Sequence, residues 1–292
     1  AFGCRFALLA NLLIFSTMRP AYLKNKWYPG DELECRTAMD HFADSTTPQT
    51  GTYKTLIAPH AGWAFSGQAM GQGYRWLSEM NPNTDLVVVF GAHRGPYGPT
   101  TVFCGDAWET PLGNLINAEP IAQQLKADLG IASEPERPGR PDNAAEVHMP
   151  FVKHFFPKAE LLMLGVPAAE TALEIGDAVE KTTKRFQRKA VFIGSTDLTH
   201  YGPQYNFADH GSGSDAQHWV RSTNDRGFVD TLLEGKPHEA LQHAQTHLSA
   251  CCPGAAIASW QAAQNAKAEL ATGREINHYL SSDVVPGDNF VG

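Results

Sequence analysis

Residues 86–95 read LVVVFGAHRG, an apolar run that ends in a glycine turn and a histidine. Such a run, bounded by a turn, is typical of a strand that is buried on both faces of a parallel sheet. Gly91 allows the chain to turn sharply directly after the strand. The stretch therefore predicts a buried strand whose carboxyl end delivers His93 to the edge of the sheet.

Similar apolar runs recur along the chain and alternate with segments of helical spacing. Further strands are predicted at residues 55–58, 101–103, 160–164 and 189–193. Helices are predicted at residues 67–77, 118–129, 146–155, 168–186, 215–233, 237–247 and 253–270. This alternation predicts an α/β fold in which a mainly parallel or mixed central sheet is covered by helices on both faces.

We expect one domain over residues 18–292. Residues 1–17 contain an apolar run that is too short to span a bilayer, and they read as a non-native or signal-like extension. At the other end, residues 289–291 resemble the start of a strand that is cut off. The domain therefore begins near Met18 in this interpretation, and its last strand is truncated.

The charge and the cysteine content of the chain indicate which partners and which cellular compartment to expect. The formal net charge is −8, and there is no run of lysine or arginine, so nucleic acid and anionic membranes are not expected as partners. The five cysteines, at positions 4, 35, 104, 251 and 252, form no disulfide or zinc-finger spacing. We therefore expect reduced thiols and a cytoplasmic location.

Three of the predicted strands end in polar turns that carry histidine. IAPHAG (57–62) presents His60, LVVVFGAHRG presents His93, and AVFIGSTDLTHYG (190–202) presents Asp197 and His200. In open α/β sheets, ligands bind outside the carboxyl ends of the strands. A lone histidine after a strand is more often a structural hydrogen-bonding residue, but three strands with this pattern predict a shared site.

A thiol adds to this pattern. HLSACCPGAAIASW (247–260) places Cys251 just before a helix that opens with Pro253, where the helix terminus favours the thiolate. Two imidazoles and one thiolate suit a transition metal ion, namely copper, iron or zinc. We expect the Cys252 side chain to point elsewhere, and His247 to support the site by a hydrogen bond. An inert buried Cys251 and a capping role for Asp197 are the alternatives.

Seven sequence blocks occur in an order that resembles the Memo family, also known as protein B of the AmmeMemoRadiSam system. The blocks are MRPAYLKNKWYPGD (18–31), APHAGWAFSG (58–67), VVVFGAHRG (87–95), ETPLGNL (109–115), EVHMPF (146–151), GSTDLTHYG (194–202) and ACCPGAAIA (250–258). The resemblance runs from about Met18 to the end of the chain and implies a fold similar to LigB-type class III extradiol dioxygenases, which use iron.

The resemblance also implies a site. Family members have a metal site of two histidines and a cysteine, which falls here on His60, His93 and Cys251, with Asp197 and His200 as acidic and basic neighbours. In the dioxygenase relatives a carboxylate replaces the thiolate. The resemblance therefore favours a redox metalloprotein with copper or iron, in which His200 exchanges a proton and Asp197 polarises it.

Two alternatives come from other classes. One is a dioxygenase-like oxidoreductase, in which Trp63 and Tyr201 stack on a small aromatic substrate, although core packing of these rings is equally expected. The other is a non-catalytic binding module that acts with a radical-SAM protein, a partner that the system's name implies. A hydrolase with Ser195 as nucleophile ranks last, because GSTDL lacks the GxSxG pattern.

The chain departs from the family pattern near the expected pocket. Residues 142–146 read DNAAE where the family has EHSLE, so Asn143 replaces a histidine. A neutral amide is neither a general base nor a strong metal ligand. Cys252 stands where the family usually has glycine. The sequence therefore predicts a divergent family member. Any activity that needs the family histidine as a base or ligand is not expected where Asn143 replaces it.

Overall fold

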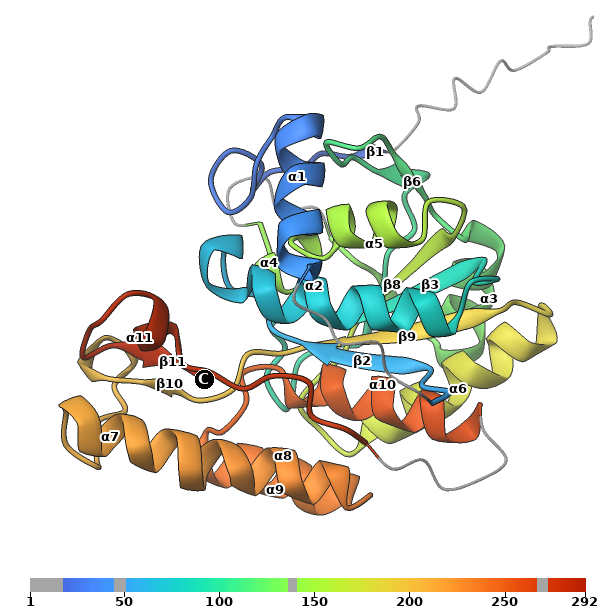
Figure 1. Ribbon diagram of the computed structural model, residues 1–292. Coiled ribbons are helices and arrows are strands. Elements are labelled where there is room, and N and C mark those ends of the chain that lie inside the picture. The colour runs from blue at the N-terminus through green and yellow to red at the C-terminus, as the bar shows by residue number, and fades with distance from the viewer. Residues whose placement is uncertain (1–17, 45–50, 136–140, 267–272) are drawn as a thin grey trace, which may run out of the picture.

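The computed structural model describes residues 18–44, 51–135, 141–266 and 273–292. Its centre is a six-stranded sheet in the order β2-β9-β3-β8-β4-β7 (Figure 1). These strands are β2 (Thr55–Ala58), β9 (Ala190–Ser195), β3 (Leu86–Gly91), β8 (Glu160–Gly165), β4 (Thr101–Val102) and β7 (Ala132–Ser133). All neighbouring pairs are parallel except β4 and β8. The predicted α/β fold with a mainly parallel sheet is therefore confirmed.

Strand β3 shows why the sheet needs helices on both faces. All six of its residues are buried. Leu86, Val88 and Phe90 belong to one core, whereas Val87 and Val89 belong to the core on the opposite face. Because successive side chains of a strand point to opposite faces, an uninterrupted apolar run requires cover on both sides.

Helices form a layer on each face of the sheet (Figure 1). One layer contains α1 (Glu32–Ala43), α2 (Trp63–Met80), α4 (Asn143–Glu146) and α5 (Met149–Phe155). The other contains α3 (Glu119–Leu129), α6 (Thr171–Arg185) and α10 (Pro253–Asn265). Helix α10 packs on α6 and against β9, β2 and β3.

Smaller elements complete the described chain. A second sheet joins β1 (Met18–Arg19), β5 (Ala107–Trp108) and β6 (Leu115–Ile116). Beside the main sheet lie α7 (Gly213–Trp219), a π-helical turn (Val220–Asn224), α8 (Asp225–Leu233) and α9 (Pro237–His247). The C-terminal part adds α11 (Ser281–Val284) and β11 (Phe290–Val291), which pairs antiparallel with β10 (His200–Tyr201); a 3₁₀ turn, Pro203–Tyr205, follows β10.

Two predicted helices differ from the structure for identifiable reasons. The helix predicted at 146–155 is interrupted between α4 and α5, because Pro150 cannot continue a helix through Glu146. The helix predicted at 215–233 is present, but it contains the π-helical turn. This turn places Asn224, whose side-chain amide donates to Thr199 Oγ1 at 2.9 Å.

Other boundaries agree with the prediction to within a few residues, and helix α1 was missed. In α1 only Cys35, Met39 and Ala43 are buried, and the apolar Leu33 is exposed on the same helix, which blurs the helical pattern. Its start is fixed by Asp31, whose carboxylate accepts from two backbone amides of the first turn. The predicted extension at 1–17 and residues 267–270 of the last predicted helix lie outside the described residues.

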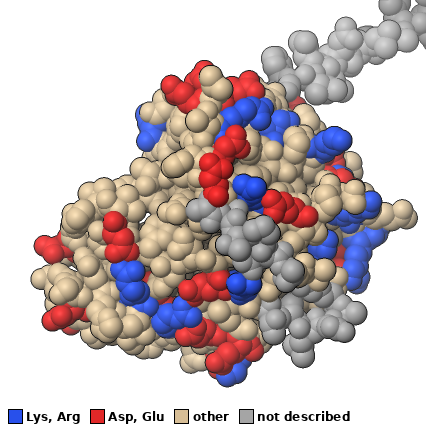
Figure 2. All heavy atoms as spheres, viewed as in Figure 1, with Lys and Arg blue, Asp and Glu red and all other residues tan. Residues whose placement is uncertain are grey.

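On the face shown in Figure 2, blue and red side chains are interspersed rather than gathered by sign. Within the described ranges, no helix is long and apolar enough to cross a membrane.

Close packing at the start of α10 yields a stability prediction. A methyl group on Gly254 would overlap the carbonyl oxygen of Pro167 and lie 2.6 Å from its carbon. We expect Gly254→Ala to lower the free energy of unfolding by about 2 kcal/mol, the usual size of an overpacking penalty. Urea denaturation measures this. Gly95→Ala is the matched control, because its methyl group would enter open space; equal stability of the two variants would contradict the packing argument.

Candidate metal centre

The carboxyl ends of three adjacent strands bring the predicted residues together. Strand β9 lies between β2 and β3, with Ala58 opposite Ser195 and Phe90 opposite Gly194. The three strands therefore end at the same level, and the chain continues from them to His60, His93 and Asp197. The rings of His60 and His93 meet edge to face, with centroids 4.8 Å apart.

Cys251 lies in the loop between α9 and α10, and this loop brings its side chain to the same strand ends from the helical layer that contains α10. Its backbone amide donates to the carbonyl oxygen of Asp197 at 3.1 Å, and the amide of Asp197 donates to its Sγ at 3.3 Å. Its Sγ lies 3.2 Å from His60 Nε2. This reciprocal pair of bonds fixes the thiol against the carboxyl end of β9.

Two groups of metal-ligating side chains share this thiol. His60, His93, Cys251 and Cys252 each offer a donor atom, and these four atoms lie within 4.8 Å of one another. The same limit holds for the group Asp197, His200 and Cys251. The structure therefore contains a His/Cys cluster of the size that a metal ion requires.

The two histidines of the cluster are held by their Nδ1 atoms. His60 Nδ1 lies 2.8 Å from Ser195 Oγ, and His93 Nδ1 lies 3.0 Å from a carboxylate oxygen of Asp142. Each ring therefore has Nε2 left for the cluster. Histidines that bind metals usually have their other ring nitrogen fixed by such a partner, which sets the tautomer and the orientation of the ring.

A buried hydrogen-bonded chain continues from His60 into the core. Ser195 Oγ also lies 3.0 Å from His148 Nε2, and His148 Nδ1 lies 3.1 Å from the Tyr74 hydroxyl oxygen. Burial and the nearby charge of His60 lower the pKa of His148 to about 3. If the neutral His148 carries its proton on Nδ1, its Nε2 accepts from Ser195, and Ser195 can accept from His60 Nδ1–H. In that tautomer the Nε2 lone pair of a neutral His60 faces Cys251.

Charges within the cluster stabilise one another. Burial lowers the pKa of His60, but the Asp197 carboxylate and the Cys251 thiolate outweigh this effect, and the pKa is raised. Burial raises the pKa of Cys251, whereas the neighbouring thiol of Cys252 and the charge of His60 bring it well below its usual range. Without a metal, these charges favour the imidazolium–thiolate form of the His60 and Cys251 pair.

His93 sits on a constrained turn. Ala92 precedes it in the left-handed region, with φ of 66°, a conformation that residues with a side chain seldom adopt. Both the backbone amide and Nδ1 of His93 bond to Asp142, which also caps α4. Burial lowers the pKa of His93, but Asp142 and Cys251 raise it to about 10.

Asp197 and His200 flank the cluster, as the sequence suggests. Asp197 Oδ1 accepts from the backbone amide of His60 at 2.6 Å, while Oδ2 lies 3.7 Å from His200 Nε2. This distance is too long for a hydrogen bond, and His200 Nε2 is buried without a partner among the described residues. Burial lowers the pKa of His200, but Asp197 and Cys251 raise it to about 9.

The two aromatic residues expected at a substrate lie in cores instead. Trp63 is 3% exposed, packs against Tyr28 and Phe151, and donates from Nε1 to the carbonyl of Val147. Tyr201 is 1% exposed and stacks on Phe290. Their large apolar rings are buried by the helices and strands around them, as the core alternative anticipates.

Three other predicted residues have clear positions. Asn143 donates from Nδ2 to the carbonyl of His60 at 2.9 Å, so it holds the backbone of a cluster residue. His247 is exposed at the end of α9, where its ring contacts His243 and not the cluster; the turn at Leu248 directs it away. Ser195 is fully buried between two histidines, which does not suit a nucleophile.

The sequence analysis missed Asp142, His148 and the position of Cys252. The sulfur of Cys252 belongs to the four-donor group instead of pointing elsewhere. Asp142 directly precedes the divergent Asn143, and His148 lies inside the quoted EVHMPF block. Both residues therefore lie in or beside sequence blocks that were already identified. Their roles depend on hydrogen bonds to distant segments, which these blocks do not show.

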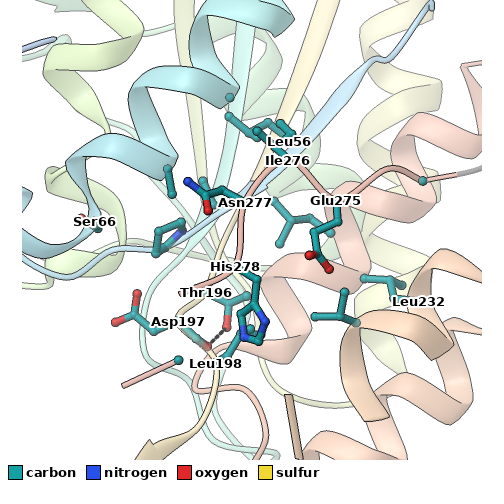
Figure 3. A pocket seen from close by; sticks show the side chains of 18 of the residues that line it. Leu56, Ser66, Thr196, Asp197, Leu198, Leu232, Glu275, Ile276, Asn277 and His278 are labelled. Carbon is teal, nitrogen blue, oxygen red and sulfur yellow. Dashed lines mark hydrogen bonds between the residues drawn. The ribbon is translucent and has the colours of Figure 1, made fainter. Parts of the chain in front are cut away.

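A cavity of about 280 Å³ lies on the other side of the β2 and β9 ends. Its mostly apolar wall includes Leu56, Leu232 and Ile276, and none of the four donors of the cluster is part of it. In Figure 3 the carboxylate of Asp197 points away from Leu232 and His278. Pro59, Ala61 and Asp197 are also in the cavity wall, so the cavity adjoins the cluster at the ends of these strands.

A family model and curated relatives point to the same family. The family described as Memo-like protein matches residues 19–292. A MEMO1 family protein of Methanothermobacter thermautotrophicus is 33% identical over 54% of this chain and 59% of its own length. A MEMO1 family protein of Methanocaldococcus jannaschii is 29% identical over 86% of this chain and 85% of its own. An uncharacterized protein of Escherichia coli K12 aligns with a TM-score of 0.42 at 15% identity, over 65% of this chain and 80% of its own.

The bond between His93 and Asp142 yields a prediction. In metal-free protein, Asp142→Asn removes the carboxylate that raises the pKa of His93, so this pKa should fall from about 10 toward the ordinary histidine value of about 6.5. Titration of the imidazole signals by NMR measures the shift. Asp40→Asn removes the carboxylate paired with His154 and serves as control. An unchanged His93 titration in Asp142→Asn would show that Asp142 does not set its charge.

Proposed function

The chain belongs to the Memo family, and we propose that it is a metal-binding protein that holds one transition-metal ion between His60, His93 and Cys251. One observation carries the proposal: Cys251 Sγ lies 3.2 Å from His60 Nε2, in a group of donor atoms that also includes His93. A thiolate beside two imidazoles is a strong combination for copper, iron or zinc.

The local chemistry fits such an ion. Both imidazoles are oriented through Nδ1, so their Nε2 lone pairs need no rearrangement of the surrounding hydrogen bonds. The low pKa of Cys251 supplies the thiolate form that binds metals. The raised pKa values of His60 and His93 mean that an ion must displace protons, so affinity should increase with pH.

A redox role with copper or iron is part of the proposal. Such an ion supplies one-electron chemistry, and the residues around it would manage the accompanying proton. His200 lies beside Asp197 and Cys251, and its pKa of about 9 keeps a proton available at neutral pH. Asp197 holds the backbone of His60 and faces His200, so it would orient both rings.

The dioxygenase-like alternative has less support. It needs aromatic walls beside the cluster, and Trp63 and Tyr201 are packed in cores. Asn143 binds a backbone carbonyl and offers no general base. The association with a radical-SAM protein and the cytoplasmic location stay predictions.

Metal analysis of the purified protein tests the proposal. We expect close to one equivalent of copper or iron, and its loss in His60→Ala and in Cys251→Ala, because each removes a ligand. His238→Ala and Cys104→Ala are matched controls outside the cluster and should retain the metal. Protein that is metal-free after expression in metal-supplemented medium, and that takes up no metal on titration, would contradict the proposal.

A further inference from the structure

Cys252 is a buried nucleophile that the proposed site does not use. It is 3% exposed, and its sulfur belongs to the same group of four donor atoms as Cys251, His60 and His93. Two adjacent thiols with two imidazoles form the complete ligand set of a tetrahedral metal site. Building on the proposed function, we infer that Cys252 is a fourth ligand and that the site is a four-coordinate N₂S₂ site.

The backbone presents both sulfurs to the same point. The amide of Cys252 donates to Thr196 Oγ1 at 3.0 Å, while the amide of Cys251 donates to the carbonyl of Asp197 at 3.1 Å. Both cysteines are thus tied to the segment that leaves β9, and Pro253 begins α10 directly after them. These two backbone bonds hold both cysteines beside Thr196 and Asp197, next to the cluster.

The separations suit a small ion. Bonds of about 2.3 Å to sulfur and about 2.0 Å to nitrogen place tetrahedral donors roughly 3.3–3.8 Å apart. The four donors lie within 4.8 Å, and His60 Nε2 to Cys251 Sγ is already 3.2 Å. The Cys252 thiol has two bonds that an ion would replace, one to the sulfur of Cys251 and a weak one to the carbonyl oxygen of Ala92 at 3.7 Å. Donors at the 4.8 Å limit would have to move closer to bind one ion.

The second thiolate has to be made by the ion. The hydrogen bond to Cys251 and burial raise the pKa of Cys252 well above its usual range, so an ion bound through both sulfurs must displace the Cys252 proton. The second thiolate then balances the charge that a divalent ion keeps with two imidazoles and one thiolate. Sulfur-rich tetrahedral sites favour a d¹⁰ ion, Zn²⁺ or Cu⁺, over octahedral ions. With four protein ligands, no coordination position is left for a substrate unless one ligand is released.

Titration of the reduced, metal-free protein with Co²⁺ tests this inference. The near-ultraviolet thiolate-to-cobalt absorption reports the number of bound thiolates. We expect the wild-type protein to bind one equivalent in a tetrahedral site. Cys252→Ala should lose about half of this absorption, since one of two thiolates is removed, and should bind Zn²⁺ at least tenfold more weakly in competition. The same competition with Cu⁺ identifies the preferred d¹⁰ ion.

Control variants distinguish the loss of one ligand from a loss of the fold or of the whole site. Cys104→Ala removes a thiol outside the cluster and should leave absorption and affinity unchanged. Cys252→Ser preserves the side-chain size, and its circular dichroism checks the fold. Wild-type absorption and affinity in a folded Cys252→Ala would overturn the fourth ligand and leave the three-residue site intact. Absence of Co²⁺, Zn²⁺ and Cu⁺ binding by the wild-type protein would overturn the N₂S₂ site, and absence of iron binding as well would overturn the proposed function.

Discussion

Asp197, just beyond the carboxyl end of β9, joins His60 and Cys251 in the candidate site. Its carboxylate accepts from the backbone of His60, its amide donates to the sulfur of Cys251, and its carbonyl accepts from the amide of Cys251. Strand β9 lies between β2 and β3, so the parallel sheet itself sets the distance between His60 and His93. The cluster therefore depends on the alignment of three strand ends and on one residue that ties the opposite helical layer to them.

The buried chain behind His60 explains how the site tolerates both the presence and the absence of an ion. When His60 is protonated, Nδ1–H donates to Ser195 and Nε2–H faces the thiolate of Cys251. Loss of the Nε2 proton leaves the bonds from Nδ1 to Ser195 and on to His148 unchanged. The contact between Nδ1 and Ser195 therefore holds the ring in the orientation that a ligand role requires. Preorganisation of this kind lowers the cost of binding.

Much of this arrangement could be predicted from the sequence. The run LVVVF identifies a doubly buried strand, and histidines that follow strand ends must meet at one edge of a parallel sheet. Blocks such as GAHRG and ACCPG then identify the family. The start of a strand expected at 289–291 is present as β11. The short strands β1 and β10 and the π-helical turn could not be predicted, because they depend on contacts between distant segments. The same is true of the bonds from Asp142 to His93 and from His148 to Ser195, which join residues 49 and 47 positions apart.

The predictions that differ from the structure are those that rested on residue type and position along the chain alone. Trp63 and Tyr201 lie next to site histidines along the chain, yet their rings turn into cores. His247 is four residues from Cys251, but the left-handed turn at Leu248 separates them. Cys252 was expected to point away because neighbouring side chains usually diverge, whereas the attachments to Thr196 and Asp197 bring both sulfurs to the cluster. Backbone hydrogen bonds, which sequence patterns do not display, decide each of these cases.

Anomalous X-ray diffraction from crystals of the metal-loaded protein tests the central claim most directly. Data collected on both sides of the metal absorption edge locate the ion independently of any assumption about its ligands. The account predicts one strong peak within bonding distance, roughly 2.0–2.3 Å, of His60 Nε2 and Cys251 Sγ, with His93 as a further ligand. A metal peak elsewhere on the protein, with the cluster empty, would contradict it.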